Sequence, residues 1–535
     1  MAASLSRRGL LKLGGGVAAA GVAAAVAANA IAEDPATSAT WHSKLVYPGA
    51  DGRLKYAAEA NGKKIPDFSW AGYRNGEAEI PDVTVVKTIG PVKDDNTAHI
   101  QKALDEVGEL PKGEDGFRGA LLLKPGHYKV SGTIKLKRSG VVLRGSGKGA
   151  DTNVNTVITG TGGPDIKAVI AVGGTSGDWS SQVAGTKTNV TSSVVEAGSR
   201  RLTLASTANL KVGDNIIIHH PCTQKWLDAI NGGGVKNQPP WKVDSLPIVY
   251  NRYVKRIEGN DIVVCAPVFN ALRKSYSQSY VYKWDQAGLV RDVGVENLRV
   301  DMGAPAAEDE NHPQSCVAVT RAEDAWVRGS SLLHFSVSGV VVQRSTRVTV
   351  QDVRASHPRS QLIGERRYNF SAAGMAQQVL FRGLWATHAR HAFIATGSST
   401  CSGIVWLDGY NENGYSESGG HQRWSHGLLY DNIKELSSKA DNAWVLSLHN
   451  RGDLGSGHGW SSVNSVAWNC TVDNGKRLCV QRPPTSQNFA IGTTGTVTNV
   501  NWYTHQLGYV EGTNKSGLDP KSLYLAQLAD RLGGL

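Results

Sequence analysis

Residues 121–147 read LLLKPGHYKVSGTIKLKRSGVVLRGSG and carry a clear β-structure signal. Three apolar segments stand here, at 121–130, 134–136 and 141–143, with Gly, Pro and Ser between them. Short runs of Val, Ile, Leu and Tyr bounded by such turn residues are typical of β-strands. We therefore predict three strands joined by tight turns, which form the first coil or two of a larger β-structure.

A short apolar strand followed by a small or polar turn residue recurs through the C-terminal half. It stands at 295–297, 327–329, 350–352, 381–383, 407–409, 430–432 and 468–470, at intervals of 23 to 38 residues. A unit of this size cannot bury its apolar face alone but can do so when stacked on its neighbours. Strands of a β-sandwich, the alternative, follow one another at about 8–12 residues. The pattern favours a solenoid, with Gly or Asn at left-handed corners and a possible Asn ladder between coils.

The composition agrees with a turn-rich β-protein. The 535 residues include 61 Gly, 14 Trp and 16 Tyr but only 3 Met, a balance that suits a sugar-binding β-protein better than a helical bundle. Hydrophobic residues make up 40% and charged residues 19%, which excludes a disordered chain and a membrane protein. The net charge of +11 favours an anionic partner. Because no run of five or more Lys/Arg occurs, we expect no nucleic-acid partner.

A capped amphipathic helix is predicted at 94–105, with Ile100, Ala103 and Leu104 on one face. Such a helix would cover the open end of a solenoid. Together with 121–147, it resembles the start of the pectate-lyase-like superfamily of right-handed parallel β-helices, and the pattern extends over about 80–500. The resemblance implies an all-β, right-handed parallel β-helix and a polysaccharide lyase. It does not fix the reaction, since the superfamily includes lyases, hydrolases and phage adhesins.

We predict six segments along the chain. A signal peptide at 1–32 and an aromatic-rich lead-in at 33–80 precede a cap helix and the first coils at 81–190. An inserted antiparallel β-subdomain at 191–285 interrupts the coils, and the main coils follow at 286–505. The tail at 506–535 contains a short amphipathic helix, for which a C-terminal cap is the expected role.

The N-terminus resembles a bacterial twin-arginine export signal. Arg7 and Arg8 precede an Ala/Gly/Val run, and an Ala-x-Ala cleavage pattern stands at 30–32. The apolar run is only weakly hydrophobic, which favours a cleaved signal over a membrane anchor. We expect a secreted or periplasmic protein with no stable membrane insertion, and a monomer in preference to an oligomer.

Six cysteines are present, and none belongs to a C-x-x-C pair of the kind found in zinc ribbons. Disulfides are permitted outside the cytoplasm. Cys470 and Cys479 are the best local candidates for a disulfide, with buried free thiols as the alternative.

Polar side chains crowd between 354 and 460, where seven of the 15 histidines fall. The segments at 388–391, 411–423 and 449–451 follow strands of consecutive coils, and neighbouring coils lie about 4.8 Å apart, so their side chains can form one patch. The candidate catalytic residues are His421, Arg423, His391, Tyr368 and His449. The candidate substrate-binding residues are Arg366, Arg367, Arg390, Asn413, Arg451 and Trp424.

This residue set suits β-elimination on a uronate. The reaction needs a cation to neutralise the C6 carboxylate, a base to remove the C5 proton and an acid to protonate the departing O4. Arg423, Arg367 and Arg451 are candidates for the cation. His421 and His391 are the base candidates, with His449 a weaker one, and Tyr368 is the acid candidate. The expected partner is an acidic polysaccharide, and no cofactor is required.

Two other functions stay open. A glycoside hydrolase would use paired carboxylates, for which the candidates are Asp408, Glu412, Glu417 and Asp431. The same acids could hold Ca²⁺ in place of the arginine, although no dense Asp cluster favours this. A noncatalytic carbohydrate binder is the third possibility, but a binder does not need His, Arg and Tyr focused within a few coils. No P-loop, G-x-S-x-G or H-E-x-x-H motif supports other chemistries.

Overall fold

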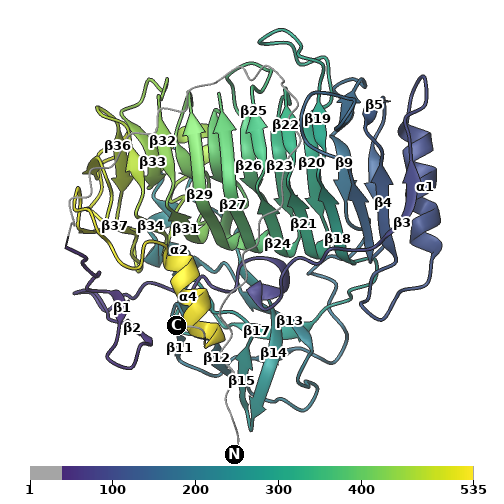
Figure 1. Cartoon of the computed structure of the whole chain (residues 1–535). Helices are drawn as coiled ribbons and strands as arrows, with labels where there is room; N and C mark the ends of the chain where they lie inside the picture. The colour runs from purple at the N-terminus through teal and green to yellow at the C-terminus, as the bar shows by residue number, and fades with distance from the viewer. Residues whose placement is uncertain (1–38, 534–535) are drawn as a thin grey trace, which may run out of the picture. The chain divides into compact units, whose positions relative to one another are not determined.

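The computed structural model describes residues 39–533, so the predicted signal peptide at 1–32 lies outside the described residues. Within the described part, three rows of parallel strands wind into a β-helix (Figure 1). Connections between parallel strands of one sheet are right-handed in nearly all proteins. The predicted all-β, right-handed parallel β-helix with an antiparallel insertion is confirmed.

Each coil contributes strands to the three rows, and each strand pairs with its counterpart one coil away. The first row comprises β3 (Val85–Ile89), β4 (Gly119–Leu123), β7 (Val141–Arg144), β18 (Val290–Glu296), β21 (Ala322–Arg328), β24 (Thr346–Gln351), β27 (Gln377–Thr387), β29 (Ser402–Glu412), β31 (His426–Asp431), β34 (Val466–Trp468), β37 (Phe489–Ile491) and β39 (Tyr509–Glu511). The second row comprises β5 (Gly126–Val130), β8 (Thr156–Gly160), β19 (Arg299–Asp301), β22 (Ser331–Leu333), β25 (Arg354–Ser356), the second halves of β27 and β29, β32 (Lys434–Leu436) and β35 (Thr471–Val472). The third row comprises β6 (Ile134–Leu136), β9 (Ala168–Val172), β20 (Ser315–Thr320), β23 (Ser338–Gln343), β26 (Tyr368–Ala372), β28 (His391–Ala395), β30 (Ser418–Gly420), β33 (Trp444–Leu448), β36 (Arg477–Val480) and β38 (Thr496–Thr498).

Stacked side chains fill the interior. At one position of the first row, Phe381, Trp406 and Tyr430 occupy successive coils in register. Their rings are nearly parallel, with centroids 5.6 Å apart for the first pair and 4.8 Å for the second. All three side chains are fully buried. Such stacks are what an apolar residue at a fixed place in each coil produces.

The corner between the first and second rows is left-handed, as predicted. Positive φ angles of 52–64° occur at Asn297, Gly329, Asp352, Gly383, Asp408, Asn432 and Asn469. In two coils, the corner lies one residue earlier than the predicted 409 and 470. The predicted ladder is present, because Asn432 Nδ2 donates to Asp408 Oδ1 at 3.0 Å and Asn469 Nδ2 donates to Asn432 Oδ1 at 2.7 Å.

Two helices flank the coils. Helix α1 (Thr97–Glu109) contacts β3, β4, β6 and β7 at the first coils, where a cap was predicted. Helix α4 (Leu523–Leu532) lies on the flank, and its start is bound by Asp431, whose Oδ2 accepts from Ser522 Oγ and the Tyr524 amide. Asp431 belongs to β31, which precedes β34, β37 and β39 along the row, so α4 is not placed over the last coil.

The insertion is an antiparallel sheet of six strands in the order β10 (Thr188–Asn189), β17 (Tyr280–Lys283), β13 (Asn215–His220), β14 (Ile248–Glu258), β15 (Asp261–Val264) and β12 (Arg201–Thr203). A second pair joins β11 (Val194–Val195) to β16 (Leu272–Arg273), and helix α2 (Gln224–Ala229) follows β13. The lead-in adds the hairpin β1 (Val46–Pro48) and β2 (Leu54–Tyr56) and the 3-10 turn Tyr73–Gly76. Two short turns, Asn231–Gly233 and Ser398–Thr400, and α3 (Leu454–Gly457) complete the elements.

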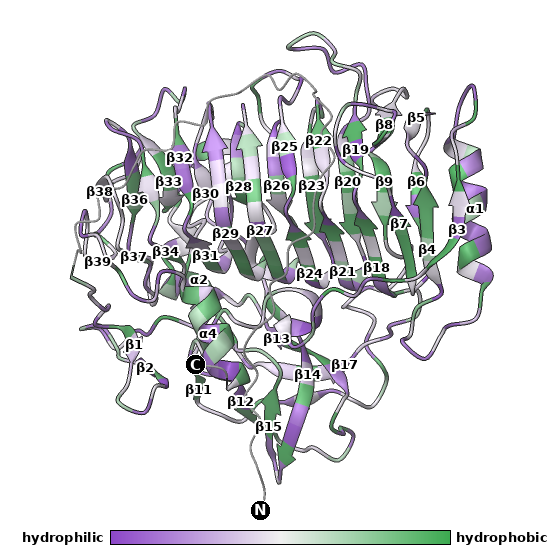
Figure 2. Ribbon diagram, viewed as in Figure 1, coloured by the Kyte–Doolittle hydropathy of each residue, from purple (hydrophilic) through white to green (hydrophobic). Residues whose placement is uncertain are grey.

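Part of the outer side of the first row is covered by the lead-in and by α4. Leu380, Val405 and Leu429 pack in one apolar cluster with Phe68 of the lead-in and Leu523 of α4. Figure 2 shows the first-row strands as largely hydrophobic, in keeping with this cover. This face of the coils is therefore partly occupied by other parts of the chain.

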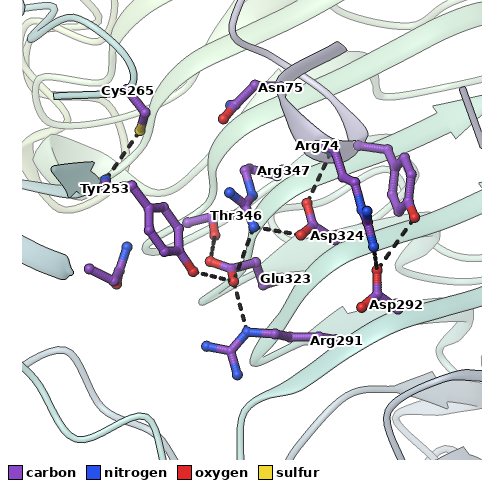
Figure 3. Close-up of polar contacts among 12 residues, drawn as sticks. Arg74, Asn75, Tyr253, Cys265, Arg291, Asp292, Glu323, Asp324, Thr346 and Arg347 are labelled. Atoms are coloured by element: carbon purple, nitrogen blue, oxygen red, sulfur yellow. Dashed lines mark hydrogen bonds and ion pairs between the residues drawn. The ribbon is translucent and has the colours of Figure 1, made fainter. Parts of the chain in front are cut away.

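A buried polar cluster joins the lead-in, the insertion and the coils (Figure 3). Glu323 of β21 accepts from Tyr253 Oη of the insertion at 2.6 Å and from Arg291 Nε at 2.9 Å, and it pairs with Arg347 at 3.2 Å. The neighbouring Asp324 accepts from the Arg74 amide of the lead-in. Burial raises the pKa of Glu323, but the two arginines outweigh it and hold this pKa below its usual value. We interpret the cluster as an electrostatic clamp between lead-in, insertion and coils.

All six cysteines are buried free thiols, which is the alternative that the sequence left open, and the candidate Cys470–Cys479 disulfide is not formed. Cys470 follows first-row strand β34, where its Sγ donates to the carbonyl of Tyr430 at 3.2 Å, whereas Cys479 lies in third-row strand β36. The two side chains therefore belong to different walls of the coil. No helix among residues 39–533 has the length and apolar character needed to span a membrane.

Candidate active site

A cluster of Tyr, His and Arg side chains lies along the third row. Tyr368 begins β26 and His391 begins β28, and the two are paired in register one coil apart. His421 directly follows β30 of the next coil. The ring of His391 lies 5.4 Å from that of Tyr368 and 4.9 Å from that of His421. The winding of the coils thus gathers three of the predicted catalytic residues.

The Tyr368 hydroxyl is the meeting point of the cluster. It accepts from the backbone amide of Glu365 at 3.1 Å and from Arg390 Nη1 at 3.4 Å. It also lies 3.4 Å from His421 Nε2. Because the first two partners can only donate, the hydroxyl proton is directed to His421 Nε2. This arrangement places the phenol hydroxyl between an imidazole nitrogen and a guanidinium.

Burial favours the neutral form of the central histidines. Burial lowers the pKa of His391 well below its usual value, and His421 and nearby arginines lower it further. Burial likewise lowers the pKa of His421, with His458 and Arg390 adding to the effect. His391 Nδ1 lies 2.5 Å from the carbonyl oxygen of Glu417 and therefore donates to it, which leaves Nε2 as the acceptor. A neutral imidazole with a free lone pair can act as a base.

Two further histidines border the cluster. The ring of His458 lies 4.9 Å from that of His421, and burial, aided by Arg451 and Arg423, lowers its pKa to about 4. His449 Nδ1 accepts from Asn501 Nδ2 at 2.7 Å. Burial lowers the pKa of His449 to about 3, so it too is neutral at working pH.

Five buried polar atoms of this region have no hydrogen-bond partner among the described residues. Buried polar groups are normally paired, because leaving one unpaired costs about 1–3 kcal/mol. A concentration of such atoms is what a site prepared for a polar ligand presents. The atoms are His391 Nε2, His421 Nδ1, His449 Nε2, His458 Nδ1 and Arg451 Nε.

Of the predicted arginines, Arg390 is the one that contacts the Tyr368 hydroxyl. Arg451 is held in a buried ion pair with Glu417. Arg367 Nη2 donates to the carbonyl of Ala307 at 3.0 Å, and Arg366 pairs with Glu310 at 2.9 Å. These contacts fix loops beside the cluster, so the guanidiniums of Arg451, Arg367 and Arg366 already have partners.

Arg423 lies at the rim rather than in the cluster. Its Nη2 donates to the carbonyl of Ser456 at 2.7 Å and to Ser456 Oγ at 2.6 Å. It thereby holds the loop that carries His458. The structure supports a positioning role for this residue more than the neutralising role predicted from the sequence.

The prediction that Trp424 binds substrate is wrong. Its side chain is fully buried, packs edge-on against Trp226 and Trp241 of the insertion, and donates from Nε1 to Asn270 Oδ1 at 2.9 Å. Asn413 occupies a left-handed corner after β29, with φ 57°, and no described contact joins its side chain to Tyr368.

The four acids considered for hydrolysis lie in separate environments. Asp408 belongs to the corner ladder, and Asp431 is closed beneath the start of α4. Glu417 pairs with Arg451, and Glu412 accepts from Trp385 Nε1 on the second-row face. The described structure therefore shows no pair of these carboxylates at the Tyr368 cluster. Among residues 39–533, no group of three or more His, Cys, Asp or Glu side chains is arranged to hold a metal ion.

Sequence reasoning missed Trp502, whose side chain is 39% exposed beside the cluster. Arg451 Cζ lies 5.5 Å from its ring centroid, and the rings of His449 and Trp444 lie 6.1 Å and 4.9 Å away. The adjacent Asn501 is fixed by Gln481, which donates to Asn501 Oδ1 at 3.0 Å. A sugar ring could stack on this rigidly held indole. No motif marks it, because Trp502 is 81 residues from His421 in sequence.

Comparisons with known proteins relate the chain to others through its fold. No family model and no curated protein matches it. The tailspike protein gp49 from Pseudomonas phage LKA1 is similar, with 14% identity and a TM-score of 0.39 over 75% of this chain and 64% of that one. The polygalacturonase from Erwinia carotovora ssp. carotovora is also similar, with 9% identity and a TM-score of 0.39 over 83% and 96% of the two chains. This chain thus spans just under two thirds of the tailspike, and both similarities concern the fold alone.

Proposed function

We propose that the protein is a polysaccharide lyase that cleaves an acidic, uronate-containing polymer by β-elimination. The observation that carries the proposal is the Tyr368 hydroxyl, which is bound by Arg390 and lies 3.4 Å from the neutral imidazole of His421. These three groups are the cation, base and acid that the reaction needs.

Arg390 takes the neutralising role in this proposal. It binds the C6 carboxylate of the uronate, which makes the C5 proton more acidic. No described acidic side chain lies within 4.0 Å of Arg390, so its charge is available to a substrate. Arg451, by contrast, is already neutralised by Glu417.

His421 and Tyr368 then divide the proton transfers. His421 Nε2 removes the C5 proton, the C4–O4 bond breaks as the C4–C5 double bond forms, and the Tyr368 hydroxyl protonates O4. The proton held by His421 then returns to the Tyr368 phenolate across their 3.4 Å contact, which restores both groups. Because base and acid lie side by side, we propose that the proton and O4 leave from the same face of the sugar. His391 packs edge-on against His421, with ring centroids 4.9 Å apart, and in this proposal it orients that imidazole.

The hydrolase alternative has less support from the geometry. Glycoside hydrolysis needs two carboxyl groups on either side of an open cleft, about 5–9.5 Å apart. Glu417 is engaged by Arg451, and Asp431 is fully buried under α4. We further propose export through the twin-arginine pathway, a monomeric state and activity without a resident metal.

The test is to incubate the purified protein, without its signal peptide, with polygalacturonate, alginate and hyaluronan, with and without EDTA. β-Elimination produces a conjugated, ultraviolet-absorbing uronate at each new non-reducing end. We expect this absorbance to rise on one of the polymers and to persist in EDTA. New reducing ends without the absorbance would instead indicate a hydrolase. Loss of activity in EDTA would indicate that a metal ion, and not Arg390, neutralises the carboxylate.

A further inference from the structure

The outer side of the second row carries an in-register ladder of two aromatic and two cationic residues. Arg354 of β25 pairs with Trp385 of β27, Trp385 pairs with Tyr410 of β29, and Tyr410 pairs with Lys434 of β32. Neighbouring coils are about 4.8 Å apart, so the ladder runs about 14 Å along the β-helix. We call these four residues the second-row strip.

The two aromatic side chains of the strip are open to solvent. Trp385 is 42% exposed and Tyr410 is 43% exposed, whereas Trp326, Trp406, Trp424 and Trp468 are fully buried. Arg354 Cζ lies 4.1 Å from the Trp385 ring centroid, and Lys434 Nζ lies 5.3 Å from that of Tyr410. Glu412 accepts from Trp385 Nε1 at 3.2 Å and fixes the indole. Adjacent exposed aromatics contribute little to the core and are typical of binding surfaces.

The cations of the strip lack the partners that other surface charges have. In the same row, Arg299 is paired with Asp301 at 2.6 Å. No described acidic side chain lies within 4.0 Å of the charged atoms of Arg354 or Lys434. The strip therefore offers two aromatic rings with an uncompensated positive charge at each end, which complements an anionic ligand with apolar ring faces.

We propose that the second-row strip is a docking site for an acidic polysaccharide chain, separate from the Tyr368 cluster. Sugar rings contact Trp385 and Tyr410 through their C–H faces, and their acidic groups bind Arg354 and Lys434. The choice of an acidic polysaccharide rests on the proposed function, but the strip needs no chemistry at Tyr368.

The second-row strip lies on the face next to the Tyr368 cluster, where it can tether a long polymer. Trp385 lies in the second row, and six residues later His391 begins the third-row strand of the same coil, after the left-handed corner at His388. A long polymer held on the strip is thus kept on the face next to the cluster. Tethering of this kind raises the local concentration of the remaining chain without any new contact at the reacting sugar.

The test compares binding and turnover in strip variants. Affinity electrophoresis in gels containing polygalacturonate, alginate or hyaluronan, with dextran as the neutral control, measures binding for wild type and for the double variant Trp385→Ala/Tyr410→Ala. We expect the double variant to bind the acidic polymer at least about tenfold more weakly, since each aromatic contact contributes about 1 kcal/mol. Val212→Ala, an exposed position on the insertion, is the matched control and should bind like wild type.

A second variant removes charge without touching the rings. Arg354→Gln/Lys434→Gln should also weaken binding and flatten its salt dependence. All arms are repeated in Tyr368→Phe, so that binding is read without cleavage. If the wild type binds and both double variants bind as tightly, the strip is not a docking site. Binding to dextran as strong as to the acidic polymers, or wild-type binding to none of them, would also overturn the proposal.

Turnover separates this proposal from the proposed function. With the strip intact, KM should be lower for the long polymer than for a trisaccharide of the same sugar, and the strip variants should raise KM for the polymer alone. If no polymer is cleaved but binding still depends on the strip, the lyase proposal fails and the docking site stands.

Discussion

The Tyr368 hydroxyl lies 3.4 Å from His421 Nε2, although 53 residues separate the two in the chain. The contact exists because Tyr368 opens β26, His391 opens the paired strand β28, and His421 follows β30, which pairs with β28. Three turns of one solenoid thus bring an acid candidate and a base candidate together. Local sequence alone could not have created this contact.

Tyr368→Phe should abolish most of the elimination activity. The substitution removes the proton donor for O4 but keeps the ring that packs on His391 and His421. General acid catalysis contributes about 10²–10⁴ in rate, so kcat should fall by that factor while the thermal unfolding temperature changes little. Tyr276→Phe, on the partly buried Tyr276 of the insertion, is the control. Equal activity in Tyr368→Phe and the control would remove Tyr368 from the mechanism.

Arg390→Ala should lower kcat/KM by about 10²–10³, because the uronate carboxylate loses its neutralising partner. Arg390→Lys should recover part of the loss, since it restores the charge without the planar guanidinium. The control is Arg366→Ala, which removes a neighbouring guanidinium that is paired with Glu310. Initial rates over a range of substrate concentrations give kcat/KM for each variant. An effect of similar size in the control would point to general electrostatics instead of a specific contact.

Trp502→Ala should raise KM about tenfold and leave kcat within about twofold, because a stacked sugar is lost while the proton transfers are unchanged. Val500→Ala tests the same loop, since Val500 is also exposed. A fall in kcat with no change in KM would mean that the indole supports His449, whose ring is 6.1 Å away, and does not bind sugar.

The fold could be predicted from sequence because each coil repeats the same local pattern, an apolar strand followed by a residue suited to a left-handed corner. Asn297, Asp352 and Asn432 each follow an apolar strand, and each occupies a left-handed corner. The helix at Thr97–Glu109 could also be predicted from local sequence, because it has a polar start and an apolar face. These are local properties, and a repeat displays them several times along the chain.

The site was only partly predictable, because burial and partners depend on how separate coils and the insertion pack. His391, His421 and Tyr368 lie together as expected. Nothing in the sequence shows that the charge of Arg451 is neutralised by an ion pair with Glu417. Trp424 is adjacent to Arg423 in sequence, yet it turns inward against Trp226 of the insertion. A motif in sequence therefore located the region but not the direction of each side chain.

Asp431→Asn should stabilise the protein at pH 8. Burial, with a smaller contribution from Asp408, raises the pKa of Asp431 to about 7, against about 4 in an unfolded chain. The folded protein therefore binds more protons than the unfolded one between these values, and its stability falls as pH rises from about 4 to about 7. Asparagine can still accept from Ser522 Oγ and the Tyr524 amide, but it carries no charge.

The measurement is urea-induced unfolding of wild type and Asp431→Asn at pH 5 and pH 8. The difference between the two proteins should be larger at pH 8, because only the wild type then buries a carboxylate. Asp473→Asn, on a half-buried aspartate for which burial is less complete, serves as the control. A variant less stable than wild type at pH 8 would mean that the carboxylate is needed as a charged partner of α4.

The corner ladder makes a last prediction, about Asn432. Its Nδ2 donates to Asp408 Oδ1 and its Oδ1 accepts from Asn469 Nδ2, while its backbone has φ 55°. Asn432→Ala removes two hydrogen bonds and leaves a Cβ in the left-handed region with no side-chain compensation, so it should cost about 2–4 kcal/mol. Asn432→Gly relieves the backbone and should cost about 1–3 kcal/mol. The difference between the two variants measures the strain.

Asn413, at φ 57° and with no described side-chain bond to a neighbouring coil, provides the control. There, alanine should cost only the strain of about 1 kcal/mol and glycine almost nothing. Equal losses at both positions would show that backbone conformation, and not the amide ladder, stabilises the stack of coils.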